Sequence, residues 1–255
     1  MVRNIHFHIS IAPSLLDKYL ANGWYRIGPF VFTTNHIDHP DASYRVFWLR
    51  YNMQKFQCGP RQERLMKALS RFSISVKPLR ITEELEDLFT KYRSAIDFNT
   101  SETIYKLLYD ELAPSFIPPS LFNSQVVEIR DGEKLIAAGI LDLGENSSAG
   151  IVNFYDPSYK KYSLGKCLML IKMEFSRNRG MEFYYPGYIA VDLPKFDYKL
   201  FADEDAAEIF DPVSQNWLPY SRRLIEELRE YLPAPGLNAI KEGVISEKAN
   251  WQDLI

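Results

Sequence analysis

The sequence predicts a mixed α/β protein in which a largely antiparallel sheet carries a central helix and a small N-terminal domain comes first. Strand-like runs separated by Gly and Pro fill the first 80 residues. From residue 125 three strand-like runs follow one another, and a helical repeat and a further strand come next. The composition, 46% hydrophobic and 25% charged with 12 Gly and 15 Pro, excludes collagen, a disordered tail and a coiled coil. The 255 residues suffice for one large domain or two modest ones.

Residues 1–80 are expected to form the small N-terminal domain. Their strand-like runs read IHFHISI, WYRIGPFVFTT and YRVFWLRY. Gln62–Phe72 is predicted to be helical, because Leu65, Leu69 and Phe72 fall on one helical face.

The next unit, residues 81–205, begins with two predicted helices. Thr82 is a good N-cap for the run EELEDLFTKYRSAI, whose apolar residues recur at helical spacing. A second helix is expected to begin at Thr100 or Ser101 and to end before Pro114.

An antiparallel meander is predicted from Gln125 onwards. The runs VVEIR, KLIAAGILDLG and AGIVNFYDP are its three strands, and the turn Asp131-Gly132 makes the first two a hairpin. Ser163–Arg179 follows as a helix that Gly180 stops, and MEFYYPGY returns as a strand. Pro194–Phe201 is a short helix or turn.

The remaining residues, 206–255, are expected to hold a C-terminal helix and a polar tail. The chain becomes acidic after Asp205, and Pro219–Leu232 has a helical pattern that Pro233 and Pro235 end.

This order of meander, helix, strand and short helix resembles the core of GNAT acyltransferases, in which a splayed pair of strands admits a donor carbonyl. GNAT enzymes that use CoA hold its pyrophosphate on a glycine-rich turn at the start of the central helix. The equivalent stretch here, Lys160–Cys167, has one glycine. Use of acyl-CoA therefore remains the alternative reading, with the helix N-terminus and two lysines as the only phosphate-binding features.

Positive charge gathers in one part of the chain although the formal net charge is −3. Nine Lys or Arg residues lie between Arg45 and Arg80, against one acidic residue, Glu63. This run is a candidate phosphate-facing surface. The alternative is a solvated face paired with the acidic residues that follow it.

Neither a metal nor another cofactor is expected. Cys58 and Cys167 are the two cysteines of the chain, too few for a four-cysteine site. His36 and His39 have the spacing of a metal-ligand pair, but a polar turn beginning at Asp38 is the preferred interpretation. Because the chain has no long apolar stretch and no signal-peptide pattern at its start, we expect a cytoplasmic protein with no membrane partner.

Five segments carry a more specific resemblance. They are Asn22-Gly23-Trp24-Tyr25-Arg26-Ile27-Gly28, Phe154-Tyr155-Asp156-Pro157-Ser158-Tyr159, Ser163-Leu164-Gly165, Tyr185-Pro186-Gly187-Tyr188 and Pro194-Lys195-Phe196-Asp197-Tyr198-Lys199. In order and spacing they resemble arginyl-tRNA–protein transferases and the related bacterial aspartate/glutamate leucyltransferases. The resemblance spans about residues 20–205 and implies a GNAT-like fold.

Membership of that family implies transfer of an amino acid, Arg or Leu, from aminoacyl-tRNA to the α-amine of a protein with an acidic N-terminal residue. This transfer marks the protein for degradation in the N-degron pathway. Family members carry a cysteine cluster between the N-terminal glycine segment and the basic helix, and here that stretch, residues 36–56, has no cysteine. A relative that binds tRNA or acidic N-termini without catalysis therefore remains an alternative.

The chemistry of ester aminolysis suggests roles for several residues. The developing oxyanion and the departing ribose oxygen need donors, for which Ser163, Tyr188 and Tyr198 are hydroxyl candidates. Asp156 or Asp192 is a candidate acceptor for the amine. The alternative for each tyrosine is a buried structural role.

The resemblance places the reaction where Ser163-Leu164-Gly165 opens the central helix opposite Tyr185-Pro186-Gly187-Tyr188. We therefore expect contacts to the substrate from Gly165, Tyr185 and Gly187, and a contact from Lys199 to the phosphate of the tRNA acceptor end.

Cationic side chains are expected to bind the charged parts of both substrates. Arg26 and Arg50 are the candidates for binding the acidic N-terminal residue, with structural ion pairs as the alternative. From the basic run, Arg64, Lys67 and Arg71 are the candidates for binding tRNA.

Overall fold

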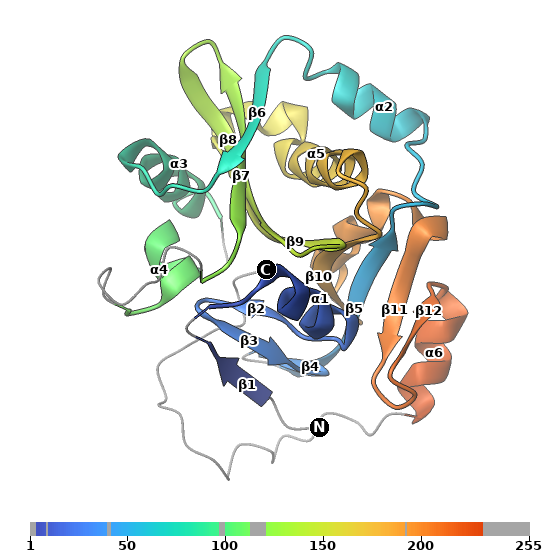
Figure 1. Cartoon of the computed structure of the whole chain (residues 1–255). Helices are drawn as coiled ribbons and strands as arrows, with labels where there is room; N and C mark the ends of the chain where they lie inside the picture. The colour runs from blue at the N-terminus through green and yellow to red at the C-terminus, as the bar shows by residue number, and fades with distance from the viewer. Residues whose placement is uncertain are drawn as a thin grey trace.

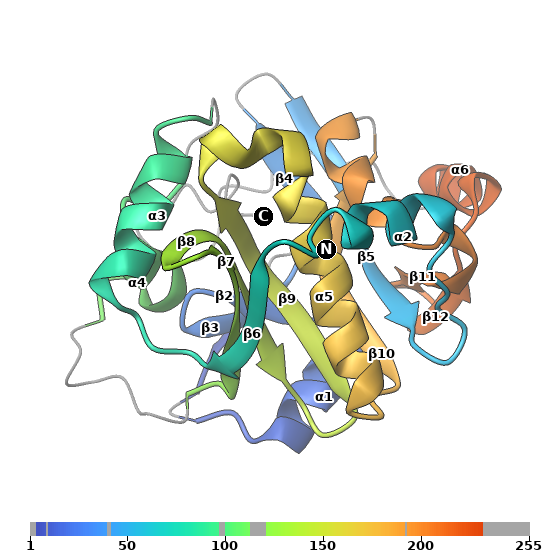
Figure 2. The same cartoon turned by 90° about the horizontal axis from the view of Figure 1, so that it is seen from above.

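The structure is a computed structural model that describes residues 4–8, 10–39, 42–96, 100–112, 121–191 and 193–231. Its strands form a small three-stranded sheet and a large nine-stranded sheet, with helices against both faces of the large sheet (Figures 1 and 2). The predicted mixed α/β class with a largely antiparallel sheet is confirmed.

The small sheet is built from the N-terminal strands. Strands β1 (Asn4–Phe7), β2 (Tyr25–Ile27) and β3 (Phe30–Thr33) pair antiparallel in the order β1-β3-β2. Between β1 and β2 runs helix α1 (Pro13–Ala21), which the sequence analysis did not predict. Pro13 at its first position suits a helix start, because proline's fixed φ is helical and its missing N–H has no partner there anyway.

Strand β4 (His36–His39) pairs antiparallel with the long strand β5 (Ala42–Asn52). The polar turn expected to begin at Asp38 is therefore wrong, since the extended backbone continues through His39. Strand β5 then lies between β10 (Phe183–Ala190) and β11 (Ala207–Asp211) in the large sheet. The boundary expected near residue 80 stays a prediction, and the large sheet runs across it.

The described residues between β5 and the meander form three helices and one strand. Thr82 caps α3 as predicted, because its hydroxyl accepts a hydrogen bond from the amide of Leu85. The next helix begins later than expected, with Thr103 as its cap. The four elements are α2 (Pro60–Lys67), β6 (Ser73–Pro78), α3 (Glu83–Arg93) and α4 (Ile104–Tyr109).

The meander consists of β7 (Ser124–Asp131), β8 (Lys134–Leu143) and β9 (Ser147–Tyr155), paired antiparallel as predicted. Its strands are buried on both sides. Ala137 and Leu141 pack in the cluster under α5 (Leu164–Asn178), whereas Ala138 packs in the cluster that includes α3. This alternation follows from the two-residue period of a strand.

The chain then crosses from β9 through η2 (Pro157–Tyr162) and α5 to β10, which runs parallel to β9. The two strands pair only where Phe183–Tyr185 meets Ser147–Ala149. Beyond that point β10 follows β5 instead, with an irregular register before Gly187, whose φ is +98°. The strands β9 and β10 are therefore splayed, as expected for a GNAT-like core.

The C-terminal elements extend the sheet past β5. Strands β11 and β12 were not predicted, and α6 begins three residues after Pro219, its expected start. The short helix expected at Pro194–Phe201 is confirmed as η3. The remaining elements are η4 (Glu204–Ala206), β12 (Asn216–Pro219) and α6 (Arg222–Tyr231).

The predicted tail, Pro114 and Asp192 lie outside the described residues. Among the helices that are described, none has the length and apolar character needed to cross a bilayer.

Candidate active site

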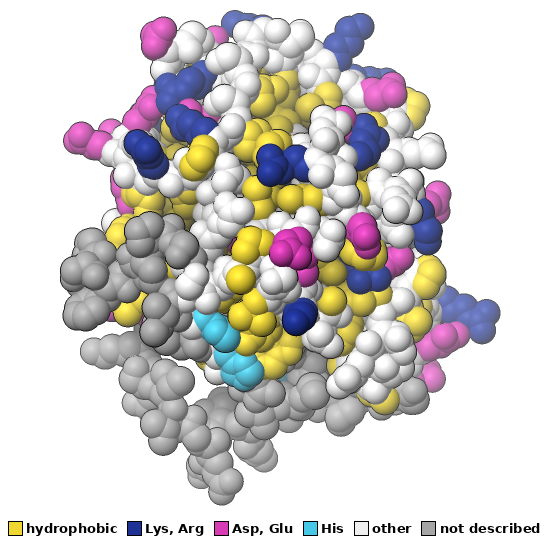
Figure 3. Space-filling view, viewed as in Figure 1, with side chains coloured by type: hydrophobic (Ala, Val, Ile, Leu, Met, Phe, Trp, Pro, Cys, Tyr) yellow, Lys and Arg dark blue, Asp and Glu magenta, His cyan; other side chains and the backbone are white. Residues whose placement is uncertain are grey.

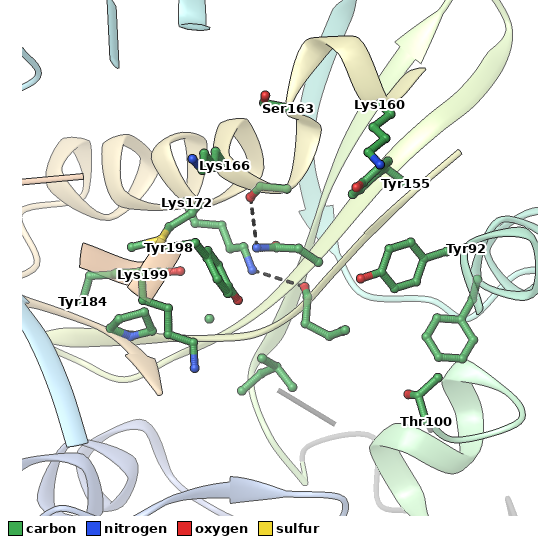
Figure 4. Close-up of a pocket in the computed structure, with 18 residues that line it drawn as sticks. Tyr92, Thr100, Tyr155, Lys160, Ser163, Lys166, Lys172, Tyr184, Tyr198 and Lys199 are labelled. Atoms are coloured by element: carbon green, nitrogen blue, oxygen red, sulfur yellow. Dashed lines mark hydrogen bonds between the residues drawn. The ribbon is translucent and has the colours of Figure 1, made fainter. Parts of the chain in front are cut away.

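The gap between β9 and β10 opens into a cavity of about 400 Å³. Figure 4 shows its walls: the start of α5 above, β9 across the middle, and Tyr92 and Thr100 at the right. Two strands that separate while both remain in one sheet leave such a space, because neither backbone fills it.

A tyrosine from the small sheet closes the point of divergence. The hydroxyl of Tyr25 donates to the carbonyl oxygen of Gly150 on β9 and lies 3.2 Å from that of Tyr185 on β10. These carbonyls face each other where the β9–β10 pairing ends. Tyr25 thus provides the donor that a neighbouring strand would supply in a continuous sheet.

The inner wall carries a cluster of polar groups that the sequence analysis did not identify. Asn153 donates from Nδ2 to the carbonyl oxygen of Gly165, 3.3 Å away, and Lys172 donates from Nζ to the carbonyl oxygen of Val152 (Figure 4). Lys172 Nζ also donates to the carbonyl oxygen of Ile140. Burial lowers the pKa of Lys172 to about 7, although the carboxylate of Asp142 acts in the opposite direction.

The cavity is lined by basic side chains. Four lysines line it, and no Asp or Glu occurs among the described residues of its wall. The four are Lys160, Lys166, Lys172 and Lys199. A site of this kind favours anionic groups and disfavours a guanidinium.

Four of the predicted site residues line this cavity: Ser163, Gly165, Tyr198 and Lys199. Ser163 has φ +53° and directly precedes α5, and its hydroxyl makes no capping bond to the helix. In Figure 4 the Ser163 side chain points away from Lys172, at the upper rim of the cavity.

Lys199 is buried, with 1% of its surface exposed. Its Nζ donates to the carbonyl oxygen of Tyr188 at 2.8 Å, and burial lowers its pKa to about 7. Lys199 therefore belongs to the cavity wall, and its contact to the phosphate of the tRNA acceptor end stays a prediction.

The residues expected from the segment opposite α5 lie beside the cavity, outside its lining. The ring of Tyr188 packs edge-on against Trp48, with centroids 5.4 Å apart, in the main core cluster. Tyr185 belongs to the same cluster, and Gly187 sits where β10 changes register.

Asp156 is the N-cap of η2, and it lies outside the cavity lining. Its carboxylate accepts from Ser158 and from Lys134, whose Nζ is 2.7 Å away. Burial alone would raise the pKa of Asp156, but these hydrogen bonds outweigh it and hold that pKa at about 2.

Both predicted arginines are already bound to carboxylates of the chain. Arg26 lies 3.1 Å from Asp142, and both side chains are almost completely buried. Arg50 lies 2.7 Å from Glu208 and stacks over the ring of Phe183. In both cases the structure has the ion pair that the sequence analysis weighed as the alternative, and neither side chain lines the cavity.

The three predicted tRNA contacts lie on or just after α2 and are exposed. Arg71 is 4.0 Å from Asp131, and two other members of the basic run, Arg50 and Lys77, are in closer ion pairs. Figure 3 shows Lys and Arg side chains scattered over the upper half of the molecule in that view, with Asp and Glu among them.

Cys58 and Cys167 lie in different parts of the structure and form no cluster. Cys167 is buried in α5, and Cys58 lies before α2 in a different core cluster. In the part of the chain that the structure describes, no three His, Cys, Asp or Glu side chains are grouped to hold a metal ion.

The topology and the splayed pair define a GNAT-like α/β protein with a cationic cavity at the start of its central helix. Residues 84–204 match the family described as "Arginine-tRNA-protein transferase, C terminus". An aspartate/glutamate leucyltransferase of Vibrio cholerae is 29% identical over 189 residues, which is 74% of this chain and 77% of that protein. One of Leptospira interrogans is 26% identical over 211 residues, 82% of this chain and 79% of that protein.

Two solved structures resemble the fold at a distance. FemX aligns with a TM-score of 0.41 and 10% identity, covering 69% of this chain and 60% of that one. A GCN5-related glucosamine N-acetyltransferase region of a fungal enzyme aligns with a TM-score of 0.40 and 13% identity, covering 73% of this chain and 20% of that one. The family match and the curated relatives show that the chain is similar to the arginine-tRNA–protein transferases and bacterial aspartate/glutamate leucyltransferases.

Proposed function

We propose that this protein transfers an amino acid from aminoacyl-tRNA to the α-amine of proteins that begin with an acidic residue. The observation that carries the proposal is the cationic cavity between β9 and β10, which lies at the start of α5. The family match over residues 84–204 and the names of the relatives support the same reaction class.

In this proposal the aminoacyl ester enters the gap with its carbonyl facing the first turn of α5. The first amides of a helix have no partner within the helix, and its positive end stabilises developing negative charge. Gly165 lies in this turn and lines the cavity, so its amide is a suitable oxyanion donor. Tyr198, on η3, supplies a hydroxyl from another wall of the cavity.

The charge of the cavity supports a choice between the two donors. A leucyl side chain is compatible with this wall, whereas an arginyl side chain would lie near Lys160 and Lys166 with no carboxylate in the described wall to pair with. We therefore favour leucine as the transferred residue. The same lysines attract the acidic side chain at the acceptor's N-terminus, a role first expected of Arg26 and Arg50.

The tRNA body is assigned to the exposed basic side chains of α2 and the turn after it. Arg64 and Lys67 point from α2 and carry no ion pair with another described residue, so they are the strongest candidates. Because aminoacyl-tRNA is the donor, the protein is expected to work in the cytoplasm, and the reaction needs no cofactor.

The decisive experiment is an in vitro transfer assay with labelled leucyl-, arginyl- and phenylalanyl-tRNA and peptides that begin with Asp, Glu or Ala. We expect label on the Asp and Glu peptides from leucyl-tRNA alone. Acetyl-CoA replaces the tRNA in a parallel reaction. Transfer from CoA but from no aminoacyl-tRNA would establish the acyl-CoA alternative, and binding of tRNA without transfer would establish a non-catalytic relative.

A further inference from the structure

We propose that Asn153 and Lys172 form the binding site for the acceptor's α-amine, with Asn153 holding the amine and Lys172 accepting its proton. The assignment rests on the proposed function, since it names the groups that would handle the nucleophile of that reaction. Neither residue belongs to the segments that suggested the family. The argument comes from an unpaired acceptor, two nearby glycines and the bonding of Lys172.

Asn153 lines the cavity and has an unused hydrogen-bond acceptor. Its Nδ2 is committed to the carbonyl oxygen of Gly165, and its Oδ1 lies beside Gly139 on β8. Oδ1 is buried and has no hydrogen-bond partner among the described residues. A buried acceptor without a donor is destabilising, so such an atom beside a cavity indicates a ligand that donates.

Two glycines in the middle of adjacent strands make room for this group. A Cβ on Gly139, which pairs with Asn153 across β8 and β9, would lie 2.7 Å from Asn153 Oδ1 and 3.1 Å from Lys172 Cε. A Cβ on Gly150 would overlap the hydroxyl of Tyr184 and lie 3.4 Å from Lys172 Nζ. Glycine weakens a strand interior and often marks a close approach. Here the missing side chains let Asn153 and Lys172 lie directly against the backbones of β8 and β9.

The bonding of Lys172 leaves one position of its Nζ for a ligand. The carbonyl oxygens of Ile140 and Val152 lie 2.9 and 3.3 Å from Nζ. A neutral amine has two N–H bonds, which these carbonyls use, and one lone pair. In Figure 4 the Lys172 side chain reaches into the cavity beside the Tyr198 ring, so the lone pair has access to a bound amine.

The surroundings of Lys172 allow the neutral form near pH 7. Its pKa is lowered to about 7 by burial, and the nearby charge that opposes the shift is Asp142 on β8, which is itself paired with Arg26. The other titratable groups at this wall are Tyr184 on β10 and Tyr198 and Lys199 on η3. Burial raises the pKa of Tyr184, so its hydroxyl stays protonated.

The step balances without a further reactant. The acceptor's α-ammonium, with an ordinary pKa of about 7.7–8.0, loses one proton to the lone pair of Lys172. The resulting amine attacks the ester carbonyl, the N–C bond forms and the C–O bond to the ribose breaks. A second proton passes from the nitrogen to the ribose oxygen, and Lys172 returns its proton to water. The net change is one amide, one free ribose hydroxyl and one released proton.

The test compares two acceptors in the intact protein: an Asp-initiated peptide, and the same peptide with an aminooxy group in place of the α-amine. An aminooxy group is already unprotonated at neutral pH and needs no base. We expect Lys172→Met to lower kcat for the amine peptide by about 10²-fold or more and to leave kcat for the aminooxy peptide within a few fold of wild type. Lys91→Met, on the exposed face of α3, controls for loss of a lysine.

A second variant and a wild-type measurement keep the test independent of one substitution. Asn153→Leu should raise KM for both peptides while the pH dependence persists. In the wild type, kcat for the amine peptide should rise through pH 7 and kcat for the aminooxy peptide should stay level.

Three results separate the two proposals. Equal loss with both acceptors in a folded Lys172→Met protein would overturn the assignment and leave the proposed function standing. A level wild-type profile with the amine peptide, or an unchanged KM in Asn153→Leu, would also overturn it. Absence of transfer by the wild type from every aminoacyl-tRNA would instead overturn the proposed function.

Discussion

The hydroxyl of Tyr25 donates a hydrogen bond to the carbonyl oxygen of Gly150, at the point where β9 turns away from β10. Tyr25 is buried and comes from the small sheet, so a strand outside the large sheet caps the end of the β9–β10 pairing. The N-terminal motif that contains Tyr25 thus supports the gap in which the reaction is placed.

Removing this hydroxyl should destabilise the protein. Tyr25→Phe leaves the carbonyl groups of Gly150 and Tyr185 without their buried donor, which should lower the free energy of unfolding by about 1–3 kcal/mol. Urea denaturation measures the change. The matched control is Tyr105→Phe, whose hydroxyl bonds the carbonyl oxygen of Leu112 in a half-buried position where water can replace it. Equally small losses of unfolding free energy in both variants would show that the Tyr25 hydrogen bond contributes no more to stability than the half-buried one of Tyr105.

The buried ion pair between Arg26 and Asp142 predicts a non-additive mutant cycle. Arg26→Met leaves the Asp142 carboxylate buried without its cation, which should cost about 3–5 kcal/mol of stability. Adding Asp142→Leu should recover much of that loss, because the uncompensated charge is gone. Chemical denaturation of the single and double variants measures the coupling. Additive losses would argue against a direct pair.

The charge of Asp156 should stabilise the protein fully above about pH 4 and progressively less at lower pH. Its pKa is held at about 2 in the folded state, compared with about 3.9 in an unfolded chain. Its contribution is therefore complete above the unfolded value and is lost as the pH falls towards about 2. Asp156→Asn keeps a capping side chain but removes the charge, so its stability deficit should shrink as the pH falls below about 4. Thermal melts from pH 7 to pH 3 measure this, and a deficit independent of pH would contradict the assignment.

Reversing the charge of the basic side chains at α2 should weaken tRNA binding and make that binding less dependent on salt concentration. Replacing Arg64, Lys67 and Arg71 by Glu should lower the slope of log affinity against log salt by about one for each tRNA phosphate that is no longer neutralised. Filter binding at several salt concentrations measures both quantities. Arg222→Glu with Arg223→Glu on α6 is the control, for which we expect little change. Equal affinity in the triple variant and the parent would show that α2 is only a solvated face.

Patterns that depend on neighbours in the sequence predicted most of the fold. The meander follows from alternating apolar runs and the turn at Asp131-Gly132, and Thr82 marks the start of α3 because a hydroxyl there satisfies a free amide. The predicted family is confirmed by the match and the relatives. Strands β11 and β12 were missed because they are short, and their pairing with the distant β5 leaves no local periodicity.

The candidate site was predicted in part. The segment that opens α5 and the segment ending in Lys199 do line the cavity. Asn153 and Lys172 were missed because their roles depend on contacts between β8, β9 and α5 that no spacing reveals. One signal was present: Lys172 lies four residues after Leu168, on the apolar face of the helix, where a charged side chain must be buried.

The position of β5 has a consequence for how the chain is made. Strand β5 leaves the ribosome well before its neighbours in the sheet, β10 and β11, which are synthesised much later in the chain. Until they emerge, the apolar strand β5 has both edges uncovered except where β4 pairs with it, which is the condition in which strands aggregate. Pairing across such a long sequence separation is also slow. Nascent chains that end before β10 should therefore depend on chaperones that cover exposed strands. We also expect a variant of the protein that lacks residues 183–211 to be insoluble.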